Sequence, residues 1–326
     1  MARLRRADPT KPGWTRRRAG TGFTYLDADG HRLPAAERRR CRALVIPPAW
    51  TDVWICPWPN GHLQAVGTDE AGRRQYLYHP LWRAMRDEAK HERVLEFGRA
   101  LPAARLAVAA DLRSGPGMPR ERALATGFRM LDLGALRMGG EQYAVERGTV
   151  GVATIRRDHV ATRQGTVRLA FPGKSGRNHH IVLSDQELTE SVHVLLRRRS
   201  GGPELLAYQH GGRWVDIGSA DLNGYIREVT GMDASAKDFR TWHGAVHALS
   251  ALTTAEADER PTRAVARAMR EVSEHLGNTP AVARSAYVHP GLVEAFLQGR
   301  ELPPGPVDAG DVEPFEQALL ELLDAS

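Results

Sequence analysis

The hydrophobic pattern of this 326-residue chain changes its period near Pro80. Before this point, short apolar runs such as Val53–Cys56 stop at proline residues or follow turn pairs such as Asn60-Gly61. Such runs are typical of β-strands joined by tight turns. After this point, apolar residues recur three and four apart over long segments, which is typical of amphipathic helices. Because a chain of this length can form two cores, the pattern predicts an α+β protein with two domains.

The segment before Pro80 predicts a small β-rich domain at residues 22–82. Its four or five strands are expected at 23–30, 43–46, 53–56, 63–66 and 75–78. Residues 1–21 are rich in arginine and are interpreted as a basic N-terminal arm that precedes this domain.

The segment after Pro80 predicts a larger, mainly α-helical domain at residues 83–300. Its helices are expected at 81–101, 120–133, 186–199, 220–229, 239–253 and 263–276. A three-stranded antiparallel sheet interrupts them, with strands expected at 149–159, 165–171 and 178–183. Residues 301–326 are interpreted as an acidic linker followed by a C-terminal helix at 315–323.

Charge is distributed unevenly along the chain. Residues 1–40 hold eleven Lys and Arg against four acids, whereas residues 301–326 hold seven acids and no Lys or Arg. The first 300 residues therefore carry +13, although the net charge of the whole chain is only +6. A body this positive predicts a polyanionic partner, with nucleic acid favoured over an acidic membrane. The alternative is that the basic residues only keep the protein soluble.

Several classes of protein are excluded by what the sequence contains. Its two cysteines, Cys41 and Cys56, are too few for a disulfide framework or a four-cysteine zinc site. No apolar stretch approaches the roughly 18 residues that a membrane helix needs. The basic N-terminus has no apolar segment behind it, so it does not predict a secretory signal. We therefore expect an intracellular protein.

Two motifs that suggest ligands have simpler interpretations. Phe171–Gly176 contains Gly-Lys-Ser, the three residues with which a phosphate-binding loop motif ends. However, Arg168 stands where that motif requires glycine, and the segment joins two strands. We therefore expect no bound nucleotide. His243 and His247 have the spacing of a metal-binding pair on a helix, yet no third ligand is evident. These two and the strand pair His179-His180, whose side chains should point to opposite faces, are interpreted as structural histidines without a metal.

A surface for duplex DNA is suggested by the strand at Gly72–Tyr78. Alternation places Tyr76 and Tyr78 on one face and Gln75 on the other, with Arg73 nearby. Tyrosine hydroxyls and arginine bind phosphates, and glutamine can read a base edge. The alternative is that the two tyrosines form an aromatic core face.

Five weak motifs gain weight from their order along the chain. They are Arg137 within Leu136–Tyr143, Lys174 in the turn 171–176, Arg240 within Ala236–Gly244, Gly277-Asn278-Thr279-Pro280, and Tyr287 in Ser-Ala-Tyr. In this order the chain resembles a poxvirus/bacterial-type DNA topoisomerase IB. The N-terminal segments Ile46–Trp50, Asn60–Gly67 and Gly72–Pro80 are similar to the DNA clamp of that family, so the resemblance runs from about Gly22 to Gln298.

The resemblance implies the tyrosine recombinase/topoisomerase IB catalytic fold and a type IB topoisomerase that relaxes positive and negative supercoils through a covalent 3′-phosphotyrosyl intermediate. Tyr287 would be the nucleophile, Arg137 and Arg240 would bind the phosphate, and Lys174 would be the general acid. Many relatives have histidine where this chain has Asn278, which can donate a hydrogen bond but cannot transfer a proton. No metal, ATP or other cofactor would be required.

The resemblance also implies a monomer that clamps double-stranded DNA, in the cytoplasm and associated with the nucleoid. The residues expected to contact DNA are Arg73, Gln75, Tyr76, Tyr78 and Tyr143. Two alternatives stay open. A tyrosine recombinase or integrase shares the chemistry, although its N-terminal domain is usually helical and it has histidine where this chain has Lys237. A non-catalytic, architectural DNA-binding protein could keep the fold without the reaction.

Overall fold

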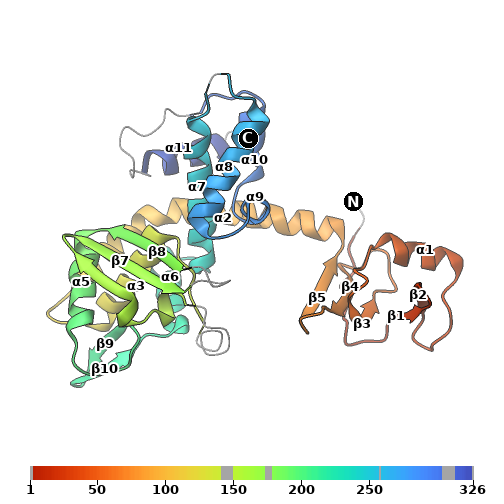
Figure 1. The fold of residues 1–326 in the computed structure, drawn as a ribbon, viewed down its shortest axis with the longest axis horizontal. Coiled ribbons are helices and arrows are strands. Elements are labelled where there is room, and N and C mark those ends of the chain that lie inside the picture. Colours follow the sequence, from red (N-terminus) through yellow and green to blue (C-terminus); the bar gives the residue numbers. More distant parts are fainter. Residues whose placement is uncertain (1–2, 141–149, 173–177, 257, 303–312, 325–326) are drawn as a thin grey trace. The chain divides into compact units, whose positions relative to one another are not determined.

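The computed structural model describes residues 3–140, 150–172, 178–256, 258–302 and 313–324 (Figure 1). The chain forms two compact units, Met1–Glu92 and Arg93–Ser326. The boundary lies inside the long helix α2 (Pro80–Leu112), ten residues beyond the sequence-based boundary at residue 82. Among the described residues, no helix is both long and apolar enough to cross a membrane.

The first unit is built on a five-stranded antiparallel sheet with the strand order β2-β1-β3-β4-β5. A small core that includes Tyr25, Cys41 and Ile55 packs on it. Burial raises the pKa of the Cys41 thiol to about 11, as expected for an unreactive core cysteine. The elements of this unit are β1 (Trp14–Ala19), β2 (Gly22–Leu26), α1 (Ala35–Ala43), β3 (Thr51–Ile55), β4 (Leu63–Thr68) and β5 (Arg74–Tyr78).

The interpretation of residues 1–21 as an arm is wrong for most of its length. Trp14–Ala19 forms β1, which pairs with both β2 and β3. The Arg16 guanidinium donates to three carbonyl oxygens, including that of Ile46, and lies over the ring of Phe23 at 4.1 Å. The backbone of Arg5 is hydrogen-bonded to the Asn60–His62 turn. Arg5 and Arg16, which the sequence placed in a basic arm, therefore belong to the folded unit, and the long Arg16 side chain suits this role because it combines an apolar stem with many donors.

The strand expected at residues 43–46 is also absent. This apolar run is the end of α1 and the turn after it, where Val45 has a φ of +49°. Helix α1 was missed because its sequence is rich in arginine and only Cys41 is fully buried, while the residues that are half-buried, Glu37, Arg38 and Arg40, are charged. Without a wide apolar stripe, the helical period is not visible in the sequence.

The second unit is mainly helical, with a three-stranded antiparallel sheet in the order β6-β7-β8, as predicted. Its core includes edge-to-face contacts of Phe239 with Phe97 and Phe128, each with ring centroids 4.9 Å apart. Helices α7 and α8 pack side by side within this unit (Figure 1). Besides part of α2, its elements are α3 (Arg120–Gly134), β6 (Val160–Arg163), β7 (Thr166–Pro172), β8 (Asn178–Ser184), α5 (Gln186–Arg197), β9 (Ala207–His210), β10 (Arg213–Asp216), α6 (Ser219–Thr230), α7 (Ala236–Thr253), α8 (Pro261–Leu276), α9 (Pro280–Ala286), α10 (Pro290–Leu297) and α11 (Glu313–Asp324).

Several details of this unit differ from expectation. Helix α2 runs to Leu112, beyond the predicted end at residue 101, and the short helices α9 and α10 were not predicted. The first strand of the sheet is Val160–Arg163, whereas the described part of 149–159 contains the short 3₁₀ turns Val152–Thr154 and Arg157–His159. The hairpin of β9 and β10 was not predicted. Each of its strands has only four residues and few are buried, so neither gives a clear alternating pattern.

Helix α11 is packed on the core of this unit rather than free as part of an acidic tail. Phe315, Leu319 and Leu323 form its buried stripe. The helix contacts α7 and α10 (Figure 1). The C-terminal helix expected at 315–323 is therefore present, and its acidic residues are carried by a docked amphipathic helix.

Candidate active site

Arg240 is the centre of the predicted catalytic group. It lies at the start of the second turn of α7, and only 6% of its surface is exposed. Its Nη1 donates to the carbonyl of Ala135 at 2.6 Å, and its Nη2 donates to the carbonyl of Leu276 at 2.7 Å. These acceptors lie at the C-terminal ends of α3 and α8, where helix carbonyls lack intrahelical partners and carry partial negative charge. Arg240 thereby joins the ends of three helices.

Arg137 approaches the same place from the segment that follows α3. Its Nη2 donates to the carbonyl of Gly277 at 3.3 Å. Its own carbonyl accepts from Val152 at 2.9 Å. Just beyond it, the backbones of Gly139 and Gly151 approach so closely that a Cβ on Gly151 would lie 2.2 Å from the Gly139 nitrogen. The backbone of Arg137 is thus held next to a close contact between Gly139 and Gly151, where neither residue has room for a side chain.

The two guanidinium groups create a strongly positive environment. Burial lowers the pKa of Arg240, and the charge of Arg137 lowers it further, while Tyr287 acts in the opposite direction. An arginine guanidinium is so strongly basic that Arg240 stays charged at neutral pH even with this lowered pKa. Two adjacent permanent cations that are incompletely neutralised by carboxylates favour binding of an anion with several oxygens, such as a phosphate.

Tyr287 lies directly after α9, against α7. The guanidinium carbon of Arg240 is 5.3 Å from the centroid of its ring. Gly244, one turn after Arg240, permits this approach, because a Cβ there would lie 2.9 Å from the Tyr287 Cβ. Sequence features fix α9: Thr279 caps it by accepting from the Val282 amide, and Pro280 is its first residue.

Asn278 lies in the turn between α8 and α9. Gly277 ends α8 in the left-handed conformation with φ +62°, and the Asn278 amide donates back to the Ser273 carbonyl at 2.9 Å, as in a Schellman motif. Both polar atoms of the Asn278 side chain are buried, and neither has a hydrogen-bond partner among the described residues. A buried amide without partners costs stability, and such groups are found where a ligand completes the hydrogen bonds.

The structure therefore brings four of the five predicted catalytic residues together. Arg137, Arg240, Asn278 and Tyr287 meet where α3, α7, α8 and α9 end or begin. The fifth, Lys174, lies outside the described residues, as does Tyr143, one of the expected DNA contacts.

The other expected DNA contacts belong to the first unit. Tyr76 and Tyr78 are 49% and 36% exposed on the same face of β5, with stacked rings 6.3 Å apart. The aromatic-core alternative for them is therefore wrong. The side chains of Arg73 and Gln75 both donate to one carboxylate oxygen of Asp69, at 2.9 and 2.8 Å. A role for Gln75 in reading bases would require it to leave that partner.

His179 lies next to the predicted catalytic residues, although the sequence did not predict it as part of the site. His179 on β8 lies against Gly277, with its Cε1 2.9 Å from where a Cβ on that glycine would be. The sequence placed it among the structural histidines, since nothing in strand alternation reveals what packs against the strand. Its partner in the sequence, His180, is exposed, so the expected alternation is confirmed.

A buried ionic network supports the helices that carry the site. The Arg105 guanidinium on α2 donates to both carboxylate oxygens of Asp132 on α3, at 2.8 and 2.9 Å. It also donates to both oxygens of Glu316 on α11, at 2.5 and 2.9 Å. On α7, Trp242 donates to Glu316 at 2.9 Å, and the His243 Nε2 lies 3.1 Å from Asp132. The assignment of His243 to a polar network is confirmed.

The network also explains how carboxylates can be tolerated in the core. Burial alone would raise the pKa of Asp132, but hydrogen bonds from His243 and Arg105 hold it well below its usual range. Burial opposes the charge of Arg105, yet its bonds to Glu316 and Asp132 raise its pKa. The network thus joins α2, α3, α7 and α11 through groups that are all charged or hydrogen-bonded.

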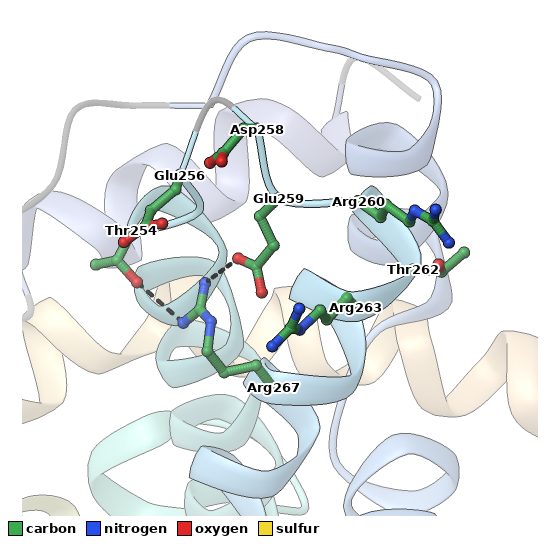
Figure 2. Close-up of a pocket in the computed structure, with 8 residues that line it drawn as sticks. All are labelled: Thr254, Glu256, Asp258, Glu259, Arg260, Thr262, Arg263 and Arg267. Atoms are coloured by element: carbon green, nitrogen blue, oxygen red, sulfur yellow. Dashed lines mark hydrogen bonds and ion pairs between the residues drawn. The ribbon is translucent and has the colours of Figure 1, made fainter.

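A large polar pocket lies away from these residues. It has a volume of about 890 Å³ between the end of α7 and the start of α8 (Figure 2). Within it, Arg267 donates to Thr254 at 3.1 Å and to Glu259 at 3.2 Å. Thr254 is fourteen residues after Arg240, so the pocket is about 20 Å along α7 from the site. Acids and arginines both line it, so it does not match the uniformly positive character of the arginine site.

A possible metal-binding group is similarly separate from the catalytic residues. Asp27, Asp29 and His31 place ligand atoms within 4.8 Å of one another in the turn after β2. Asp27 already accepts from the backbone amides of the other two, which accounts for the cluster as a turn. None of the predicted catalytic residues belongs to it.

Comparison with known proteins bears on both units. A family model described as eukaryotic DNA topoisomerase I, catalytic core, matches residues 79–297. A model described as bacterial DNA topoisomerase IB, N-terminal domain, matches residues 22–69. The first match contains all five predicted catalytic residues, and the second covers much of the sheet of the first unit.

Similar individual proteins come from large DNA viruses. The chain is 28% identical over 301 residues to DNA topoisomerase 1B of Acanthamoeba polyphaga mimivirus, covering 89% of each protein. It is 22% identical over 254 residues to DNA topoisomerase 1B of vaccinia virus (strain Copenhagen), covering 76% of this chain and 78% of the viral protein.

Proposed function

Because this chain belongs to the DNA topoisomerase IB family, we propose that it relaxes positive and negative supercoils through a covalent 3′-phosphotyrosyl intermediate. The family identifies the chain as a type IB topoisomerase and DNA as its substrate. The observation that supports this reaction most strongly is the convergence of two arginines, an unpartnered buried asparagine and a tyrosine at one set of helix ends.

The cleavage step uses Tyr287 as the nucleophile. Its phenolic oxygen attacks the phosphorus, a new P–O bond to tyrosine forms, and the bond to the 5′ oxygen breaks. Arg137 and Arg240 stabilise the negative charge that gathers on the non-bridging oxygens, and Asn278 donates a further hydrogen bond. Lys174 gives a proton to the departing 5′ oxygen. The phosphotyrosyl bond conserves the energy of the broken linkage, so religation by the reverse steps needs no ATP.

DNA binding depends on the positive charge of the first 300 residues, which carry +13. We propose that a monomer clamps the duplex, with Tyr76 and Tyr78 on the exposed face of β5 contacting it together with Arg73 and Tyr143. Arg74 lies on the same exposed face and joins this group. Because the contacts are mainly to phosphates, binding should weaken steeply as salt concentration rises. Such an enzyme acts in the cytoplasm, on nucleoid DNA.

Relaxation of supercoiled plasmid tests the proposal. In EDTA and without ATP, the protein should relax plasmids of either supercoil sign, and denaturant should trap it covalently on the 3′ side of the nick. Binding without relaxation or adduct would instead favour an architectural protein. Strand exchange between two duplexes, without progressive relaxation, would favour a tyrosine recombinase.

Replacement of Gly244 by alanine should impair cleavage without unfolding the protein. The added Cβ would overlap the Tyr287 Cβ, so the tyrosine must shift from its place beside Arg240. We expect single-turnover cleavage to slow about 100-fold, because small misplacements of a reacting group are that costly. Overpacking should cost about 1–3 kcal/mol of unfolding free energy.

Gly224→Ala provides the matched control for this prediction. Gly224 is inside α6, and an added Cβ there would meet nothing within 4 Å. This variant should cleave normally and gain about 1 kcal/mol of helix stability. Equal cleavage rates for the two variants would show that Gly244 does not set the position of Tyr287.

A further inference from the structure

His179 connects the β7–β8 hairpin to the turn that carries Asn278. It lies on β8 in register with Phe171 on β7, and the two rings are 5.4 Å apart with an angle of 34° between them. The phenylalanine is almost fully buried, so it supports one side of the imidazole. The histidine ring is therefore held at a defined place on the sheet.

The imidazole also meets the left-handed turn after α8. Its Cε1 occupies the space where a Cβ of Gly277 would be, at 2.9 Å. Gly277 offers its carbonyl to Arg137 and is followed by Asn278. The histidine is thus packed against the backbone that presents two of the four described site residues.

The imidazole suits this position because it is uncharged. Burial lowers its pKa, and the nearby charges of Arg137 and Arg240 lower it further. A neutral ring can pack between the sheet and the turn without repelling the two guanidinium groups. A lysine or arginine in its place would add a third cation next to them.

The hairpin held in this way is the one that contains the predicted general acid. Residues 173–177, which include Lys174, connect β7 to β8, and His179 is the second residue of β8. We propose that His179 is a positioning residue, which fixes the β7–β8 hairpin against the Gly277 turn so that Lys174 protonates the leaving 5′ oxygen. This inference rests on the proposed topoisomerase reaction.

The chemistry of the leaving group separates this role from general damage to the site. With an ordinary phosphodiester, the bond from phosphorus to the 5′ oxygen breaks and the oxygen takes the lysine proton. In a 5′-bridging phosphorothiolate, sulfur replaces the 5′ oxygen, so the bond from phosphorus to this sulfur breaks and releases a thiolate. The thiolate is stable without a proton because thiols are far more acidic than alcohols. A variant that only misplaces the acid should be rescued by the sulfur substrate.

The experiment measures single-turnover covalent adduct formation by the full chain on both kinds of duplex oligonucleotide. His179→Ala should slow cleavage of the normal duplex about 100-fold, as expected for a misplaced catalytic group, and lose most of that defect on the phosphorothiolate. Lys174→Ala should show the same rescue. His179→Phe, which keeps a ring against Gly277, should remain close to the wild type.

His180→Ala is the matched control, since His180 is the next residue of β8 and is exposed. It should cleave both substrates normally. Melting temperatures identify any variant that fails to fold, and His179→Phe keeps the proposal testable if His179→Ala does. The proposal is overturned if the His179→Ala defect persists on the phosphorothiolate, if His179→Phe is as slow as His179→Ala, or if Lys174→Ala is not rescued. Absence of adduct with the wild type on either substrate would instead refute the proposed function.

Discussion

Tyr287→Phe is expected to abolish plasmid relaxation and covalent adduct formation completely while leaving DNA binding intact. The substitution removes only the hydroxyl and keeps the ring that lies 5.3 Å from the Arg240 guanidinium. The arginines, and the contacts of Gly244 with the Tyr287 backbone and Cβ, are unchanged. Without the nucleophile, no phosphotyrosyl bond can form, so loss of the hydroxyl removes the reaction itself.

The measurements are relaxation in EDTA, adduct formation on labelled duplex and DNA affinity by titration. Tyr208→Phe is a suitable control, because Tyr208 on β9 is half-buried in the same unit but is absent from the predicted catalytic set. This control should relax plasmid at the wild-type rate. Both variants should stay within about 1 kcal/mol of the wild-type unfolding free energy, as expected for removal of one hydroxyl. A covalent adduct formed by Tyr287→Phe would show that another residue is the nucleophile.

Much of the fold follows from local sequence patterns. The period change at Pro80 separated a β-rich part from a helical part, and most described helices of the second unit overlap predicted segments, although the short helices α9 and α10 were not predicted. The three-stranded sheet was predicted because its strands alternate and are joined by short turns. The elements that were missed, such as α1 and the β9–β10 hairpin, are short and expose most of their side chains. For them, burial provides no periodic signal.

The arrangement of the site could be predicted only in part. The order of Arg137, Arg240, Asn278 and Tyr287 suggested one site, but their residue types do not show what holds them. Arg240 is fixed by carbonyls at the ends of two other helices, and any residue type supplies a carbonyl. His179 was missed for a related reason, since it packs where Gly277 has no side chain. Contacts with backbone carbonyls, and contacts that depend on glycine having no side chain, cannot be recognised from residue types alone.

The charge of the C-terminal segment had a different meaning from the one its composition suggested. Seven acids without a basic residue indicated an acidic linker and a C-terminal helix, with no sign of a role in the core. In α11, however, Glu316 is 7% exposed and serves as an acceptor for Arg105 and Trp242. Composition cannot distinguish an acid on a solvated face from one that neutralises a buried cation.

Glu316→Ala is therefore expected to destabilise the second unit strongly. The substitution leaves the half-buried Arg105 paired only with Asp132 and removes the acceptor of the Trp242 indole, while the Phe315 and Leu319 contacts remain. Removal of one partner from a buried ion pair costs about 3–5 kcal/mol. Because Asp132 still compensates Arg105, we expect a loss at the lower end of this range. Chemical denaturation should show this loss as a lower midpoint with a similar slope.

Glu321→Ala on the same helix separates this effect from a simple change of charge. Glu321 is exposed and, among the described residues, accepts from Gln317 one turn earlier, so its removal should change stability by no more than about 0.5 kcal/mol. If the acidity of the segment weakened DNA binding, both variants should bind DNA more tightly to the same degree. If Glu316 acts through α7, only Glu316→Ala should also slow cleavage at temperatures where it is still folded, because Trp242 lies two residues after Arg240. Equal stability of the two variants would contradict the structural role assigned to the Arg105 network.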